Sequence, residues 1–136
     1  MTTTSLEQFL VALVGIIQDA EGRVLLGLRA QERVWVCFGG KMAHGESLEE
    51  GLAREILEEV GLTLSQFARL SFDEGCLPSG QPFITLYFLT KLPAGQVPVN
   101  VEPHKCLELR WFHPDELPAE MWERDRKALL SLRSPR

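Results

Sequence analysis

The chain has 136 residues, with 14 Lys and Arg against 19 Asp and Glu, a formal net charge of −5 and 45% hydrophobic residues. This length suits one folding unit that buries its own core, so we expect a single domain over residues 1–136. The acidic balance disfavours a binder of nucleic acid polymers, because counterion release needs clustered Lys and Arg. It leaves room for a small anionic ligand whose charge is balanced by a cation.

The cysteines and the apolar runs indicate a soluble, cytoplasmic protein. Cys37, Cys76 and Cys106 are scattered and odd in number, which favours reduced thiols over a disulfide framework. The apolar run from Phe9 to Ile17 is about half of what a membrane span needs, and no Lys or Arg precedes it as in a secretion signal. We therefore expect no membrane association and interpret this run as a buried strand.

The first half of the chain predicts a hairpin, a short strand and a helix. The expected segments are a frayed start over 1–5, strands over 11–17 and 23–28 joined by a turn at 19–22, and a strand over 34–38 that Gly39 and Gly40 stop. Ser47 is a good N-cap, and Glu50 completes a capping box. The helix that begins there should run to Val60 and end at Gly61 as a left-handed cap.

The second half predicts three more strands and a closing helix. Strands are expected over 67–72, over 83–92 as a central strand, and over 106–112 with Leu107, Leu109 and Trp111 on one face. A loop covers 93–103, and an amphipathic helix over 122–132 places Ala128, Leu129 and Leu132 on its apolar side. The order of elements predicts a mixed α/β domain with a helix packed on a sheet.

The helix after Ser47 carries an unusual concentration of acids. Its apolar face is expected to comprise Leu52, Ala53, Ile56, Leu57 and Val60. Glu55, Glu58 and Glu59 stand at i, i+3 and i+4 beside that face, where like charges cost a few tenths of a kcal/mol per pair. A hard divalent cation would offset this repulsion, since Mg²⁺ prefers carboxylate oxygens. Gly51 lies one turn earlier on the same stripe and would allow close approach.

A solvated acidic face is the alternative interpretation of this helix. Three features argue against it: the acids border the apolar face, they follow a Gly-Gly turn, and their spacing fits a long specific pattern. That pattern reads Gly40-x5-Glu46-x7-Arg54-Glu55-Ile56-x-Glu58-Glu59-x-Gly61-Leu62. It resembles the Nudix box at every defined position over 23 residues.

The resemblance extends beyond the box. The segment 23–29, Trp35 and the segment 38–41 are similar to MutT-type hydrolases, which remove oxidised purine nucleoside triphosphates, and so are 117–118, 121–122 and Asp125. Glu102-Pro103-x-Lys105-Cys106, with Trp111, instead resembles nucleotide-hydrolysing relatives that carry the segment EPxKC. The resemblance implies the Nudix α/β/α sandwich, a mixed sheet between helices.

The resemblance also implies roles for individual residues. Glu55, Glu58 and Glu59 would bind Mg²⁺ (with Mn²⁺ as the alternative) together with the carbonyl of Gly39. Glu46 and Arg54 would pair and orient Glu55. One of these glutamates, or an acid outside the box, would deprotonate the attacking water. Glu102 is the candidate for that outside acid and for a further metal ligand, with Glu108 as the alternative, and Arg29 and Lys41 would lie near the phosphates.

The chemistry agrees with these residue types independently of the resemblance. Attack of water on a phosphorus that carries anionic oxygens needs charge neutralisation, which clustered metal ions supply. Removal of the proton from that water needs a nearby base, and crowding can raise a carboxylate pKa into a useful range.

Base recognition is expected from the C-terminal segment. Trp122 has a large flat face on which a base could stack, although anchoring of the last helix is an equal alternative. Asp125 could accept hydrogen bonds from a purine edge, or be a solvated helix acid. The sequence departs from the oxidised-purine enzymes at Arg124, where they carry a second acid, and at Val36, where they carry an amide.

The predicted function is Mg²⁺-dependent hydrolysis of a nucleoside triphosphate to monophosphate and pyrophosphate. The substrate expected is an oxidised or non-standard purine nucleotide such as 8-oxo-dGTP, which would make the protein a cleaner of the nucleotide pool. Two alternatives are a hydrolase of another diphosphate-linked compound and a nucleotide-binding sensor without catalysis. The only partner expected is the small nucleotide, with the protein acting as a monomer or homodimer.

Overall fold

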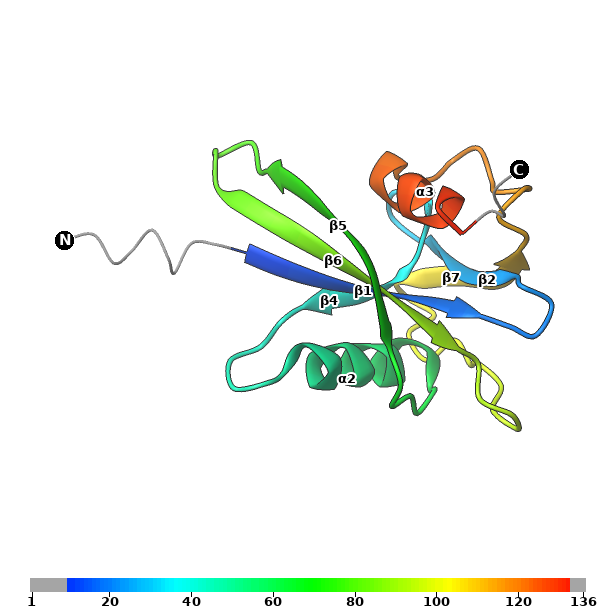
Figure 1. Ribbon diagram of the computed structural model, residues 1–136. Coiled ribbons are helices and arrows are strands. Elements are labelled where there is room, and N and C mark those ends of the chain that lie inside the picture. Colours follow the sequence, from blue (N-terminus) through cyan, green and yellow to red (C-terminus); the bar gives the residue numbers. More distant parts are fainter. Residues whose placement is uncertain (1–9, 133–136) are drawn as a thin grey trace.

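The central strand pair of the fold is parallel: β1 (Leu10–Gln18) lies beside β6 (Pro82–Lys91) along its whole length. The computed structural model describes residues 10–132, and Figure 1 shows the sheet with one helix on each face. The remaining elements are β2 (Val24–Arg29), β3 (Trp35–Val36), β4 (Phe38–Lys41), α2 (Leu48–Val60), β5 (Ala68–Cys76), β7 (Cys106–Phe112) and α3 (Glu123–Leu130). The expected frayed segment 1–5 lies outside the described residues.

The sheet has seven strands in mixed orientation. Its main path runs β3-β2-β1-β6-β5, and β4 and β7 pair with β1 and β2 respectively. All pairs other than β1 with β6 are antiparallel. The mixed sheet between two helices confirms the predicted α/β class and the central position of β6. No helix within residues 10–132 has the length and apolar content to cross a membrane.

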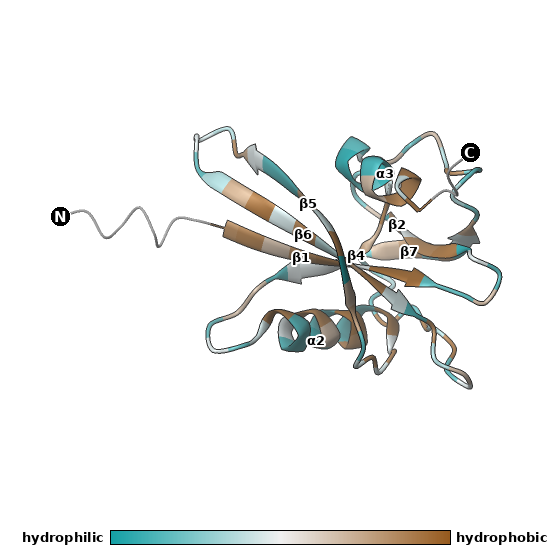
Figure 2. Cartoon of the chain, viewed as in Figure 1, coloured by the Kyte–Doolittle hydropathy of each residue, from teal (hydrophilic) through white to brown (hydrophobic). Residues whose placement is uncertain are grey.

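Successive side chains of β1 point to opposite faces of the sheet, so the core has two layers. Leu13 and Ile17 pack in the layer beneath α2, whereas Val14 and Ile16 pack in the layer beneath α3. Figure 2 shows hydrophobic residues along β1 and β2, while both helices carry a mixture of hydrophobic and hydrophilic residues. That mixture is expected of helices that cover a sheet with one face and meet water with the other.

The helix α2 begins and ends as its local sequence predicts. The Ser47 side chain accepts a hydrogen bond from the backbone N–H of Glu50, the Glu50 side chain accepts one from the N–H of Ser47, and Gly61 is left-handed with φ 70°. Its buried face is narrower than expected, because Leu57 is 49% exposed. Gly51 is buried instead, together with Leu52, Ile56 and Val60.

The segment 34–38 differs from the predicted single strand. It is divided at Cys37 into β3 and β4, because the N–H of Cys37 donates to the carboxylate of Asp125 and not to a neighbouring strand. Gly39 and Gly40 do not stop the strand. They belong to β4 and pair with Val14 and Leu13 of β1.

The bounds of β5 and α3 and the burial of one residue of β7 also differ from the prediction. β5 runs from Ala68 to Cys76, beyond the predicted end at residue 72, because it forms an antiparallel hairpin with β6 that continues to the turn. α3 is shorter than the predicted 122–132 and covers Glu123–Leu130. On β7, Leu109 and Trp111 pack against the core, but Leu107 is 48% exposed, so the core does not cover the predicted apolar face at this residue. The predicted first hairpin, the loop over 93–103 and the strand over 106–112 are confirmed.

The backbone of β4 at Gly39 lies against β1 without room for a side chain, and this gives a stability prediction. A Cβ at Gly39 would lie 1.9 Å from the carbonyl oxygen of Leu13, which is backbone and cannot rotate away. We expect Gly39→Ala to lower the free energy of unfolding by about 3 kcal/mol or more in denaturant titration. The control is Gly80→Ala, where φ is +90° and the space is open. That change should cost only about 1–2 kcal/mol, and equal losses at both positions would contradict the argument.

Candidate functional site

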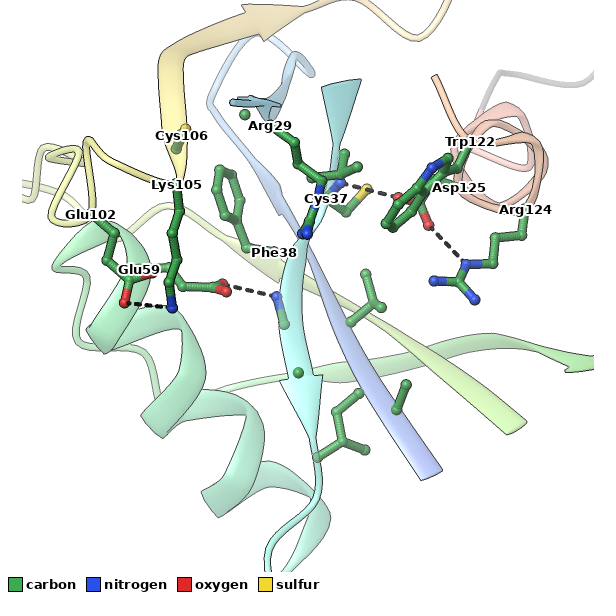
Figure 3. A pocket seen from close by; sticks show the side chains of 17 residues that line it. Arg29, Cys37, Phe38, Glu59, Glu102, Lys105, Cys106, Trp122, Arg124 and Asp125 are labelled. Carbon is green, nitrogen blue, oxygen red and sulfur yellow. Dashed lines mark hydrogen bonds and ion pairs between the residues drawn. The ribbon is translucent and has the colours of Figure 1, made fainter. Parts of the chain in front are cut away.

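A pocket opens where β4, the end of α2, the segment before β7 and the start of α3 meet (Figure 3). One end is lined by Glu59, Glu102 and Lys105, and the other by Trp122, Arg124 and Asp125. Arg29, at the end of β2, lines the stretch between them. The pocket therefore has an acidic end and an aromatic end, and the two come from segments far apart in the sequence.

Glu59 is the acid most strongly affected by its surroundings. Its Oε1 accepts a hydrogen bond of 3.0 Å from the backbone N–H of Gly39. Burial, together with the negative charges of Glu55, Glu102 and Glu58, raises the Glu59 pKa to about 8. Burial also raises the pKa of Glu55, against the opposing effect of Arg54. Both carboxylates thus lie close to other acids, but Arg54 partly balances the charge of Glu55, whereas no positive charge in the described part of the chain counters the shift of the Glu59 pKa.

Arg54 organises the acids that lie outside the pocket wall. Its Nε and Nη2 donate to the two carboxylate oxygens of Glu46 at 2.6 and 3.1 Å. Its Nη1 donates to Glu55 at 3.1 Å and to Glu58 at 3.4 Å. These bonds lower the pKa of Glu46. The fork geometry of a guanidinium suits this arrangement, since a Lys could not bind Glu46 through two parallel bonds.

Two glycines make room for these carboxylates. A Cβ at Gly40 would lie 2.4 Å from the carboxyl carbon of Glu55, and a Cβ at Gly51 would lie 3.0 Å from Oε1 of Glu46. The glycine inside the helix is therefore explained by close approach, as its position suggested.

Glu102 is the acid outside the segment 40–62 that lies beside Glu55 and Glu59. It lines the pocket, its charge acts on Glu55 and Glu59, and Lys105 pairs with it at 3.8 Å. Glu108, the alternative, instead accepts two hydrogen bonds from Arg110 on the exposed side of β7 and does not line the pocket. Lys41 is exposed at the end of β4 and is also absent from the pocket lining.

Trp122 lies at the aromatic end, close to the guanidinium groups of Arg29 and Arg124 (Figure 3). The guanidinium carbon of Arg29 is 5.4 Å from the indole centroid, and that of Arg124 is 5.1 Å away. Arg29 is fixed in part by Glu32, which accepts a hydrogen bond of 2.8 Å from its Nε. The indole is half-buried, so it is neither a surface residue nor part of the core.

Asp125 is buried, which excludes the interpretation of a solvated helix acid. Only 3% of it is exposed. Its Oδ1 accepts a hydrogen bond of 2.5 Å from the hydroxyl of Tyr87, and its Oδ2 accepts one of 3.2 Å from the N–H of Cys37. Burial, together with Asp125, holds the pKa of Tyr87 well above its usual range, so the phenol remains the donor.

Several residues of this site could not be inferred from their sequence context. Tyr87 and Phe83 lie in a strand that reads as uniformly apolar, yet Tyr87 supports Asp125 and Phe83 lies 5.7 Å from the guanidinium of Arg124. Lys105 lines the pocket, and the EPxKC segment to which it belongs does not by itself indicate a role for the lysine. The only available signal was the single tyrosine hydroxyl in the buried strand, which needs a partner when it is buried.

The donor set at the acidic end fits a divalent cation chemically. Glu59 and Glu102 at this end, and Glu55 and Glu58 beside it on α2, are hard oxygen donors. Burial first, and the negative charges of neighbouring acids second, raise the pKa of Glu59, and a cation would offset the effect of these charges. Within residues 10–132, however, no three His, Cys, Asp or Glu side chains are grouped closely enough to hold a metal ion, and Glu55 and Glu58 pair with Arg54. Binding of a cation at this end would require these side chains to turn from Arg54 toward the pocket.

Comparison with known proteins identifies the family. The model of the NUDIX domain matches residues 8–132. The oxidized purine nucleoside triphosphate hydrolase of Mus musculus is 34% identical over 125 residues, covering 85% of this chain and 74% of that protein. The protein of the same description from Danio rerio is 31% identical with the same coverage. The NAD-capped RNA hydrolase NudC of Salmonella paratyphi C is 29% identical over 100 residues, 72% of this chain and 37% of that protein.

Solved structures agree with the sequence comparison. The MutT NUDIX hydrolase from Burkholderia pseudomallei superposes with a TM-score of 0.79 at 29% identity, over 90% of this chain and 96% of that one. The MutT protein from Methanosarcina mazei Go1 has a TM-score of 0.70 at 24% identity, over 91% and 92%, which supports the fold alone. The chain belongs to the Nudix family and is a Nudix pyrophosphohydrolase. Enzymes of this family generally use a divalent metal.

The raised pKa of Glu59 gives a prediction for the metal-free protein. Its pKa is about 8 in the fold, whereas a Glu in an unfolded chain titrates near about 4.3. Between these values the native state binds more protons than the unfolded state, so the free energy of unfolding should fall as pH rises. We expect the Tm, measured in chelator, to decrease from about pH 5 to about pH 8.

Glu59→Gln should flatten this pH profile, because the amide does not titrate. Glu123→Gln is the control, since Glu123 is 86% exposed on α3 and its change should leave the profile as in the wild type. A wild-type Tm that stays constant or rises over this pH range would contradict the raised pKa.

Proposed function

We propose that the protein hydrolyses a nucleoside triphosphate to the monophosphate and pyrophosphate in a Mg²⁺-dependent reaction, with Mn²⁺ as an alternative metal. The preferred substrate is an oxidised or non-standard purine nucleotide such as 8-oxo-dGTP, so that the enzyme cleans the nucleotide pool. The observation that carries this proposal is the pocket itself, whose acidic end and aromatic end suit the two ends of a nucleotide. The relatives described as oxidized purine nucleoside triphosphate hydrolases support the purine preference.

The acidic end would hold the metal and the phosphates. Glu55, Glu58 and Glu59 would be the main ligands, with Glu102 and the carbonyl of Gly39 as further ones. When bound, the metal would neutralise the phosphate oxygens and lower the pKa of a bound water. Arg54 and Glu46 would orient Glu55, as their bidentate pair suggests. Arg29 and Lys105 would contribute positive charge along the pocket wall, and Lys41 would approach the phosphates from outside it.

A carboxylate of the cluster would remove the proton from the attacking water. Glu59 is suited to this task because it lines the acidic end of the pocket and is oriented there by the backbone N–H of Gly39. Glu102 is the alternative base, since it faces the same end of the pocket. The water would attack one phosphorus of the α–β anhydride, and the bond from that phosphorus to the bridging oxygen would break. The bridging oxygen would leave with the other phosphorus, which gives the monophosphate and pyrophosphate.

The aromatic end would hold the base. Trp122 offers a half-buried indole for stacking, and Asp125 is fixed by Tyr87 and Cys37 at the pocket wall. The alternative, a hydrolase of another diphosphate-linked compound such as a sugar nucleotide, would use the same acidic end for its diphosphate. A sensor without catalysis would have no evident need for the full set of acids and for Arg54.

Metal dependence is the first test of the proposed function. Chelation should abolish release of pyrophosphate from a panel of nucleoside triphosphates, and added Mg²⁺ or Mn²⁺ should restore it. The reason is that the phosphate charge at an acidic pocket end needs a cation. Full activity in chelator would contradict the role assigned to the carboxylates.

Substitution of two acids on α2 tests their role directly. Glu58→Gln and Glu59→Gln should each lower kcat by at least about 10²-fold. Circular dichroism and Tm should show a normal fold, or a slightly more stable one, because repulsion on α2 is reduced. Glu49→Gln, in the first turn of the same helix, should keep wild-type turnover. Near-wild-type turnover of either site variant would show that the assigned residue is neither ligand nor base.

Trp122→Ala tests whether the indole contacts the base. Loss of stacking should weaken transition-state binding by about 1–3 kcal/mol, which corresponds to about 5- to 150-fold in kcat/KM. A base-free triphosphate analogue should be affected less than the nucleotide. If Trp122 only anchors α3, the change should instead lower the free energy of unfolding by about 3–5 kcal/mol. The kcat/KM values for the nucleotide and for the base-free analogue should then fall by the same factor.

A further inference from the structure

The two polar side chains at the aromatic end differ in their free hydrogen-bonding capacity. Both carboxylate oxygens of Asp125 already accept a hydrogen bond, one from Tyr87 and one from Cys37. The Nε of Arg124 is buried and donates to no group within the described residues. Its nearest carboxylate oxygen, Oδ1 of Asp125, is 4.0 Å away, which is beyond hydrogen-bond distance.

Arg124 is held in place by packing and charge without any hydrogen bond from its Nε. Its guanidinium carbon lies 5.1 Å from the centroid of Trp122 and 5.7 Å from that of Phe83. Its side chain is 32% exposed, so the donors are partly withdrawn from water at the pocket wall. Asp125 balances its charge. The result is an oriented, planar set of N–H donors beside the indole on which a base would stack.

A ligand group beside these donors must be an acceptor. A guanidinium carries five N–H donors and no acceptor. An amino group placed against it would leave donors of both partners unpaired and partly desolvated, which is costly. A carbonyl oxygen would accept from the guanidinium and satisfy it. Since Arg124 and Asp125 are adjacent, a ring N–H beside that carbonyl could still reach a remaining lone pair of Asp125.

We propose that Arg124 is a specificity-determining residue that selects bases presenting a carbonyl oxygen at the aromatic end of the pocket over bases presenting an amino group there. The proposal rests on the proposed function, because it requires the base to lie against Trp122. Among purines it favours those with oxygen at position 6, such as guanine, hypoxanthine and 8-oxoguanine. It disfavours adenine and 8-oxoadenine, which carry an amino group at that position.

Two matched pairs of substrates test the selection. dITP and dATP differ in the group at position 6 and in the protonation of the neighbouring ring nitrogen, and 8-oxo-dGTP with 8-oxo-dATP gives an oxidised pair. We expect the wild type to prefer the 6-oxo member by about 5- to 150-fold in kcat/KM, the range that a well-placed Arg contact to a base provides. The affinities for dIMP and dAMP, measured by calorimetry in chelator, should differ in the same direction without any turnover.

Arg124→Met is the decisive variant, because it keeps most of the aliphatic stem and removes the donors. For this variant, the ratio of kcat/KM between the paired triphosphates and the ratio of the affinities for dIMP and dAMP should both fall to near one. Arg124→Lys keeps a donor, so it should retain part of the preference. Lys127→Met is the matched control: it removes the same charge from the same helix, but Lys127 is exposed and lies outside the pocket lining. This control should keep the full preference.

The outcomes separate the two proposals. A wild type that hydrolyses nucleoside triphosphates but treats the paired bases alike, or an Arg124→Met variant that keeps the preference, overturns the role of Arg124 and leaves the proposed function intact. A folded wild type that hydrolyses none of the four triphosphates with Mg²⁺ or Mn²⁺ and binds neither monophosphate overturns both. If Arg124→Met fails to fold, the wild-type preference and the Arg124→Lys variant still decide the question.

Discussion

The contacts of one guanidinium hold the acidic half of the site together. Arg54 binds both oxygens of Glu46, in the loop before α2, and also contacts Glu55 and Glu58 on the helix itself. Without it, the acids on this short stretch would repel one another with no fixed partner. The ion pair of Arg54 with Glu46 fixes the loop after β4 against α2. The strand β4 in turn places the N–H of Gly39 against Glu59. The arrangement leaves Glu59, on the pocket side, with the least compensation by positive charge.

The aromatic half depends on a separate constraint, the burial of Asp125. Its bonds to Tyr87 of β6 and to the backbone of Cys37 join α3 to the sheet at the point where β3 and β4 separate. This anchoring brings Trp122 and Arg124 to the pocket wall, opposite the acids of α2. The two halves therefore come from two helices on opposite faces of one sheet, and β4 connects them.

Local signals predicted the parts of the structure that local interactions determine. The limits of α2 followed from Ser47, Glu50 and Gly61, because caps act within one turn. The break at Cys37 could not be predicted, since its cause is a carboxylate 88 residues away. The burial of Asp125 and the exposure of Leu107 and Leu57 likewise depend on tertiary neighbours. For the site, the acidic pattern of α2 was visible in the sequence, whereas the contribution of Tyr87 and the unpaired Nε of Arg124 required the fold.

The central claim is that one pocket holds a metal-bound triphosphate among the acids of α2 and a base against Trp122. The most direct measurement is a crystal structure with Mn²⁺ and a non-hydrolysable 6-oxopurine nucleoside triphosphate, in which anomalous scattering locates the metal. We predict anomalous peaks within coordination distance of Glu55, Glu58 or Glu59, with the base stacked on the indole of Trp122. A nucleotide bound with its metal away from these carboxylates, or with its base outside the aromatic end, would contradict the account.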